Sequence, residues 1–140
     1  MKCFGIFLLV LMTFLSHAQQ DSSGLTKQGC SRFMNGQFAY VNEKLDTIVI
    51  IRKGNRQEER NLQTGTVVRS KITWTDSCAY TLTQIWSNSK AERKNNKSQT
   101  NVRITGTYPN RYDFTCACKD PADKERYSGT IVQLKQQSQY

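Results

Sequence analysis

Ile72-Thr73-Trp74-Thr75-Asp76-Ser77-Cys78-Ala79-Tyr80-Thr81-Leu82 is the stretch that decides the fold. It predicts two β-strands that meet at an Asp-Ser turn, with Trp74, Cys78 and Tyr80 around the bend. A three-residue turn from Asp76 to Cys78 would place Trp74 directly opposite Tyr80, an aromatic pair that would set the register of the hairpin. Aromatic burial and a cross-link through Cys78 both offset the entropy lost when a small chain folds. The stretch therefore indicates a small, disulfide-bonded β-domain.

Strand-forming runs separated by turn signals continue on both sides of this stretch. Asn35-Gly36 predicts a hairpin turn, because both central residues of a type I′ turn need positive φ. The strand-like runs, of which about eight are expected to form the sheet, are 30–34, 37–41, 47–53, 56–63, 66–75, 78–87, 102–108, 111–118 and 126–135, with a mobile polar loop at 88–100. The pattern predicts an all-β fold, a single antiparallel meander of about eight strands. We expect a small closed or partly open barrel that holds side chains or one small ligand.

The two ends of the chain have separate predictions. An apolar run from Phe4 to Leu15 follows Lys2 and precedes Ala18, which is typical of a signal peptide over 1–18. The run is too short to span a bilayer, so we expect a secreted or periplasmic protein that is not integral to a membrane. A flexible leader at 19–29, the barrel domain at 30–136 and a tail at 137–140 would follow.

Charge and composition exclude several classes of function. The 140-residue chain carries a net charge of +9, and loss of the signal peptide would leave it near +8. Cleavage would also remove His17, the only histidine, and with it serine–histidine and cysteine–histidine catalysis and the commonest zinc sites. Glu58 and Glu59 are adjacent on a predicted strand and point to opposite faces, so they cannot form a glycosidase pair. We expect no enzymatic activity, no cofactor and no metal.

Four cysteines remain after the signal peptide: Cys30, Cys78, Cys116 and Cys118. An even count in a short exported chain favours disulfides, and four cysteines allow 3 pairings. We favour Cys30–Cys78, which would close a long loop and contribute about 3–4 kcal/mol. Cys116 and Cys118 lie on one face of a strand, where a disulfide between them would be strained. Pairing of Cys30 and Cys78 with these two cysteines therefore stays open.

One predicted ligand site lies on the hairpin around Gly54-Asn55. A two-residue turn there would pair Arg52 with Gln57 and place Glu59 diagonal to Arg52 on the same face. These three side chains would form one polar cluster, either at the polar end of a ligand cavity or as a structural pair that sets the register. Trp86, expected on the same strand face as Tyr80, is a further candidate at the cavity mouth or on a contact surface.

A second candidate site is a basic loop. Its residues are Lys90, Arg93, Lys94 and Lys97, with Arg69, Lys71 and Arg103 expected on the outer surface of the sheet. Such a loop would attract an anionic envelope surface in a salt-dependent way, or would simply keep the protein soluble. Export argues against an intracellular nucleic acid as the partner.

Several spaced residues resemble a known set of proteins. These are Cys30, Phe33, Asn35-Gly36-Gln37-Phe38, Arg52, Gln57, Glu59, Ile72, Trp74, Cys78, Tyr80 and Leu82. Together they resemble short exported bacterial proteins of unknown function, some of which carry a spurious topoisomerase label. That resemblance covers about Cys30 to Leu82 and implies no established activity. The predicted barrel is similar to lipocalin-like barrels in outline only, since the Gly-x-Trp motif of the first strand is missing.

Two hypotheses on function follow from the sequence. The first is a secreted, non-enzymatic binding protein for a small apolar or amphipathic molecule, or for an anionic surface. The alternative is a structural or inhibitor-like interaction module whose core is filled by its own side chains.

Overall fold

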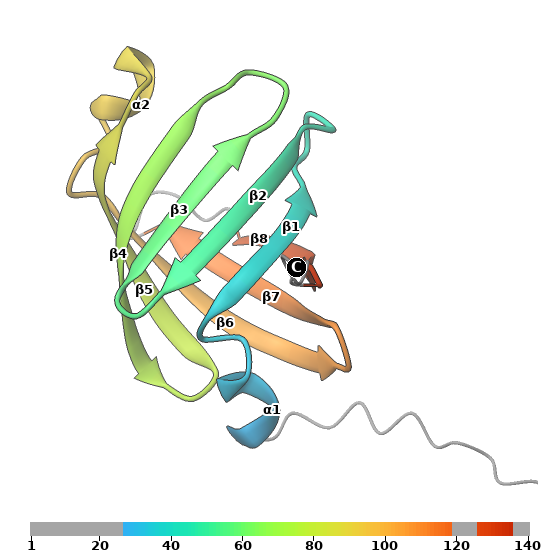
Figure 1. Cartoon of the computed structure of the whole chain (residues 1–140). Coiled ribbons are helices and arrows are strands. Elements are labelled where there is room, and N and C mark those ends of the chain that lie inside the picture. Colours follow the sequence, from blue (N-terminus) through green and yellow to red (C-terminus); the bar gives the residue numbers. More distant parts are fainter. Residues whose placement is uncertain (1–26, 119–125, 136–140) are drawn as a thin grey trace, which may run out of the picture.

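Eight antiparallel strands form a closed barrel in which each strand pairs with the next and the last pairs with the first (Figure 1). The structure is a computed structural model and describes residues 27–118 and 126–135. Outside the described residues lie the predicted signal peptide, most of the predicted leader and the predicted tail. The side chain of Cys118 is not described either. No helix within the described ranges is both long and apolar enough to cross a membrane. The predicted all-β meander is confirmed, and the barrel is closed.

The strands follow one another in chain order around the barrel. Their bounds are β1 Gly36–Val41, β2 Thr47–Lys53, β3 Arg56–Asn61, β4 Val67–Asp76, β5 Ala79–Ser87, β6 Gln99–Tyr108, β7 Arg111–Cys118 and β8 Arg126–Gln133. Within the described residues, two short helices accompany them, α1 at Lys27–Ser31 and α2 at Lys90–Arg93. The barrel closes where β1 meets β8, with Phe38 opposite Gln133 and Ala39 opposite Val132.

The expected hairpin around Asn35-Gly36 is wrong, because the chain before it is helical. Cys30 lies in α1, which begins inside the range assigned to the leader, and a turn to Met34 follows it. Both Cys30 and Phe33 are 0% exposed, so burial of these side chains outweighs the local turn preference. The amide oxygen of Asn35 instead accepts a hydrogen bond of 2.8 Å from the backbone of Gly54. The segment thus covers the end of the barrel where β2 turns into β3.

A disulfide joins α1 to the turn between β4 and β5. The bond links Cys30 to Cys78, as favoured from the sequence, with their Cα atoms 5.2 Å apart. Arg32 strengthens the attachment by donating a hydrogen bond to the backbone carbonyl of Tyr108, at the end of β6. One end of the barrel is therefore closed by α1 and the turn that follows it.

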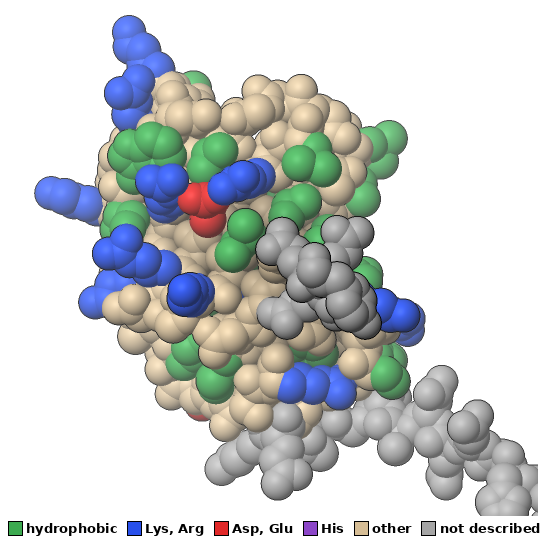
Figure 2. All heavy atoms as spheres, in the orientation of Figure 1, with side chains coloured by type: hydrophobic (Ala, Val, Ile, Leu, Met, Phe, Trp, Pro, Cys, Tyr) green, Lys and Arg blue, Asp and Glu red, His purple; other side chains and the backbone are tan. Residues whose placement is uncertain are grey.

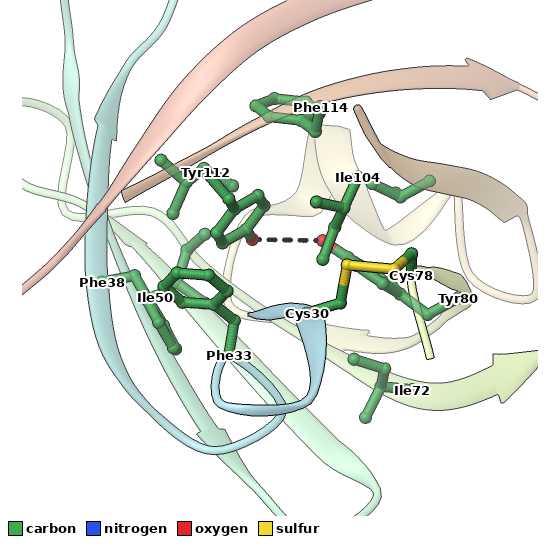
Figure 3. Close-up of a cluster of buried hydrophobic side chains, with 12 residues drawn as sticks. Cys30, Phe33, Phe38, Ile50, Ile72, Cys78, Tyr80, Ile104, Tyr112 and Phe114 are labelled. Carbon is green, nitrogen blue, oxygen red and sulfur yellow. Dashed lines mark hydrogen bonds between the residues drawn. A yellow bond between two sulfur atoms is a disulfide. The ribbon is translucent and has the colours of Figure 1, made fainter. Parts of the chain in front are cut away.

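The core fills this closed half of the barrel (Figure 3). Its buried members are Cys30, Phe33, Phe38, Ile50, Ile72, Cys78, Tyr80, Val102, Ile104, Tyr112, Phe114 and Ile131. Trp74 pairs directly with Tyr80 across β4 and β5, and the two ring centroids lie 4.7 Å apart. The expected pairing of Trp74 with Tyr80 is confirmed. The expected three-residue turn is wrong, because Asp76 pairs with Ala79 and a register shift between Trp74 and Asp76 brings the two rings opposite each other.

The segment 88–100, expected to be a mobile loop, contains regular structure instead. The side chain of Ser89 caps α2 by accepting a hydrogen bond from the backbone of Glu92. Gln84 of β5 donates side-chain hydrogen bonds to the carbonyl of Glu92 and to Asn96. Strand β6 already begins at Gln99. Polar side chains, which do not show up as hydrophobic periodicity, hold this segment in place.

Candidate functional site

Arg52 lies at the centre of the barrel and is 2% exposed. As predicted, it pairs with Gln57 across the turn at Gly54, and its Nε donates to the Gln57 amide oxygen at 2.7 Å. Its other nitrogens donate to the carbonyl of Phe33 at 3.0 Å and to the hydroxyls of Tyr80 at 2.6 Å and Tyr112 at 2.7 Å. Each nitrogen of the guanidinium therefore has an acceptor from the protein itself.

The positive charge of Arg52 is stabilised by aromatic rings and, through hydrogen bonds of Gln57, by the carboxylate of Glu59. The guanidinium carbon lies 4.7 Å from the ring centroid of Tyr80 and 5.1 Å from that of Phe38, which is cation–π geometry. Gln57, whose oxygen accepts from Arg52, donates its amide nitrogen to Glu59 at 2.7 Å. Desolvation raises the pKa of Tyr80, partly opposed by the charge of Arg52, so this phenol stays neutral.

Glu59 is the polar group that faces the other half of the barrel. Burial raises the pKa of this carboxyl, while the hydrogen bond from Gln57 and the charge of Arg52 oppose the rise. The hydroxyl of Tyr40 also donates a hydrogen bond to Glu59, and burial together with this carboxylate raises the pKa of Tyr40. The predicted cluster of Arg52, Gln57 and Glu59 is thus present and extends to Tyr40.

A cavity of about 660 Å³ opens at the end of the barrel opposite α1. Its walls come from β1, β2, β3, β4, the two turns between β1 and β2 and between β3 and β4, α2 and β8. The lining residues are Tyr40, Asn42, Glu43, Lys44, Asp46, Ile48, Glu59, Asn61, Thr64, Thr66, Val68, Glu92 and Tyr127. Glu59 is the inner polar group of this cavity, because Gln57 and Arg52 lie behind it in the closed half.

The sequence-predicted ligand residues therefore have different places. Glu59 lines the cavity, whereas Arg52 and Gln57 are buried behind it. Trp86 does not face the interior, and its expected placement on the face of Tyr80 is wrong. The register of β4 and β5 shifts at Ile85, an extra residue that turns the following side chain to the outer face. Trp86 is 40% exposed there, with the guanidinium of Arg69 at 4.6 Å from its ring.

The predicted basic residues all lie on the outside of the barrel. Lys90 and Arg93 belong to α2, Lys94 caps it, and Lys97 follows in the turn before β6; all four are exposed. The outer strand positions Arg69, Lys71 and Arg103 are also exposed. Glu58, on the outer face as expected, bonds Arg69 at 2.7 Å, and Asp76 lies 3.8 Å from Arg103. Figure 2 shows Lys and Arg side chains gathered on the side of the barrel that carries α2 and β4.

Sequence reasoning missed the tyrosines that complete the site. Tyr40 and Tyr127 line the cavity, and Tyr80 and Tyr112 supply two of the acceptors for Arg52. In β1, alternate side chains such as Phe38 and Tyr40 point into the barrel, and this alternation could have placed Tyr40 in the interior. The partners of Arg52 carried no local signal, since Tyr112 is 60 positions away in the chain.

Across residues 27–118 and 126–135, no group of three His, Cys, Asp or Glu side chains is arranged to hold a metal ion. The candidate site is a cavity with Glu59 as its inner carboxylate and with tyrosine rings, aliphatic side chains and further polar side chains on its walls. Comparison with known proteins finds no matching family model, no matching curated protein and no matching solved structure.

Proposed function

We propose that this protein is an exported, non-enzymatic binding protein that takes a small amphipathic molecule into the open end of its barrel. The observation that carries the proposal is the cavity of about 660 Å³ between the β1–β2 turn, the β3–β4 turn and α2. Sites for small molecules are typically concave, largely apolar and supplied with a few polar groups, within a range of about 300–1,000 Å³. The cavity has this size, and its walls combine Ile48, Val68 and the rings of Tyr40 and Tyr127 with a larger number of polar side chains.

Two features of the barrel favour a ligand over a filled interior. The cluster of buried core side chains and the network around Arg52 lie in the closed half, and Tyr40 and Tyr127 pack against that cluster while they also line the cavity. The open half has Ile48, Val68 and the rings of Tyr40 and Tyr127 on its walls. A chain that serves only as a structural module would gain stability by filling this space, because unfilled apolar walls lose packing contacts.

A bound molecule should be detectable directly. Native mass spectrometry of the protein purified gently from its source is expected to show a reproducible non-covalent adduct. The same protein after unfolding, delipidation and refolding should lack that adduct. If no adduct appears, and fluorescent lipid probes do not bind the refolded protein either, the ligand-binding proposal is wrong.

Blocking the cavity should remove binding. Val68→Trp is expected to weaken binding of a fluorescent alkyl-chain probe by at least about tenfold, because the indole would occupy part of the cavity. Val67→Trp is the matched control, since Val67 is the adjacent residue of β4 and points to the opposite face. Titration of the probe into both variants measures the effect. Equal affinities would place the ligand elsewhere.

A second candidate function rests on the basic outer surface. The helix α2, which carries Lys90 and Arg93, contacts β5, and the exposed Trp86 lies near the end of that strand. Basic residues beside an exposed aromatic ring suit an anionic membrane surface, where each cation contributes about 1 kcal/mol. We propose this surface as a site of contact with an anionic envelope, separate from the cavity.

Vesicle binding tests this second function. The double variant Arg93→Gln/Lys94→Gln is expected to bind phosphatidylglycerol vesicles about ten- to thirtyfold more weakly than the unmodified protein. Arg111→Gln/Lys135→Gln removes the same charge at exposed positions away from α2 and should have little effect. Co-sedimentation at two salt concentrations measures both. An equal loss in the two variants would indicate a response to net charge alone, and the proposed surface would be wrong.

A further inference from the structure

Acidic and basic residues are segregated in this barrel. Residues 27–118 and 126–135 contain seven Asp and Glu residues, and four of them line the cavity: Glu43, Asp46, Glu59 and Glu92. Lys44 is the single basic residue among the lining residues within these ranges. The whole chain has a net charge of +9, so the cavity is acidic in an otherwise basic protein. A cavity lined by one sign of charge concentrates ligands of the opposite sign.

The cavity carboxylates differ in their hydrogen-bond partners and in their depth. Asp46 accepts from the amide of Asn61 at 2.8 Å, and Glu92 accepts from the amide of Asn95 at 3.1 Å. Glu59 lies deeper, and its neighbours Gln57 and Tyr40 place it against the interior. Burial raises the pKa of Glu59, and a cation bound in the cavity would stabilise its ionised form. Glu59 is therefore the carboxylate best placed to hold a charged ligand group away from water.

The walls around Glu59 are suited to an organic group. Tyr40 and Tyr127 present rings whose faces attract cations, and Ile48 and Val68 present aliphatic surface. Burial raises the pKa of Tyr127 as well, so both phenols stay neutral. An inner carboxylate, neutral aromatic rings and aliphatic walls match an ammonium group that carries an apolar substituent.

We infer that the cavity binds a small organic amine, with its ammonium group paired to Glu59 and its apolar part against Ile48 and Val68. This inference rests on the proposed ligand-binding function and names the class of ligand. A bare metal ion fits less well, because no three carboxylates in the described ranges converge on one point. An anionic ligand fits less well too, because Arg52 is buried behind Glu59 and already has its acceptors.

Three probes of equal chain length test the charge preference on the unmodified protein. Octylammonium, octanol and octanoate differ in the head group alone, and isothermal titration measures their affinities. Octylammonium is expected to bind about ten- to hundredfold more tightly than the other two, the range for a hydrogen bond to a charged group. Equal or tighter binding of octanol or octanoate overturns the inference and leaves the proposed function standing. Binding of none of the three overturns both.

Paired variants test the role of Glu59. Glu59→Gln is expected to bring the affinity for octylammonium close to that for octanol. Glu58→Gln is the matched control, because Glu58 is the adjacent residue of β3 and bonds Arg60 and Arg69 on the outer face. The control should keep the full preference for the cation. A preference that survives in Glu59→Gln overturns the assignment to Glu59, and its loss in both variants shows an effect of net charge and also overturns it.

Discussion

Replacing Arg52 with methionine is expected to lower the free energy of unfolding by about 3–5 kcal/mol, the range for removing one member of a buried ionic network. The change leaves the carbonyl of Phe33 and the amide oxygen of Gln57 without their donor in the core. It also removes the positive charge that stabilises the carboxylate of Glu59, which is linked to Arg52 through Gln57. Urea unfolding monitored by tryptophan fluorescence measures the loss.

Arg56→Met provides the matched control for this prediction. Arg56 lies on the same hairpin but is exposed, so its replacement should change the stability by less than about 0.5 kcal/mol. A double variant that combines Arg52→Met with Glu59→Gln should lose less than the sum of the single losses, because the countercharge is removed together with the charge. Additive losses, or a loss below about 1 kcal/mol for Arg52→Met alone, would show that the network around Arg52 does not stabilise the fold.

The second large effect is expected from the double variant Cys30→Ser/Cys78→Ser. The disulfide closes a loop with a sequence separation of 48, and its removal should cost about 4 kcal/mol by the entropy of loop closure. Loss of the bond would also free α1 from the β4–β5 turn and weaken the burial of Phe33. The variant is expected to unfold at a markedly lower urea concentration than the unmodified protein.

A reducing agent distinguishes this cross-link from other effects of the substitutions. Dithiothreitol should lower the stability of the unmodified protein to about that of the double variant. It should leave the double variant itself unchanged, because the variant has no bond between α1 and the β4–β5 turn. An unmodified protein that keeps its full stability under reducing conditions would contradict the role given to the disulfide. A further loss in the reduced variant would point to Cys116 and Cys118.

Local features were predictable wherever neighbouring residues determine the geometry. The turn at Gly54 sets the pairing of Arg52 with Gln57, because a two-residue turn allows one register, and Glu59 follows by the period of the strand. The pairing of Trp74 with Tyr80 was expected from a three-residue turn, but it arises from the pairing of Asp76 with Ala79 and a register shift between Trp74 and Asp76. By contrast, Asn35-Gly36 predicted a hairpin that is absent. Burial of Cys30 and Phe33 at the barrel end contributes more than the turn preference of two residues.

The bulge at Ile85 shows where the period of a strand fails as a guide. The residues around it contain no glycine or other local sign of a bulge, and the extra residue is visible only in the pairing of β5 with β4. One shifted residue reverses the faces that follow, so Trp86 lies outside and Ser87 is buried. Local alternation could not indicate this change.

The disulfide pairing was settled by the tertiary structure, whereas the sequence by itself determined the meander order of the strands, the all-β class and the cluster of Arg52, Gln57 and Glu59. These depend on alternation and turns, which act over a few residues. Only the tertiary structure decided that α1 closes one end, that Tyr80 and Tyr112 bond Arg52, and that carboxylates gather around a cavity at the other end. Closure of the barrel brings together residues far apart in the chain, and no local pattern records which of them meet.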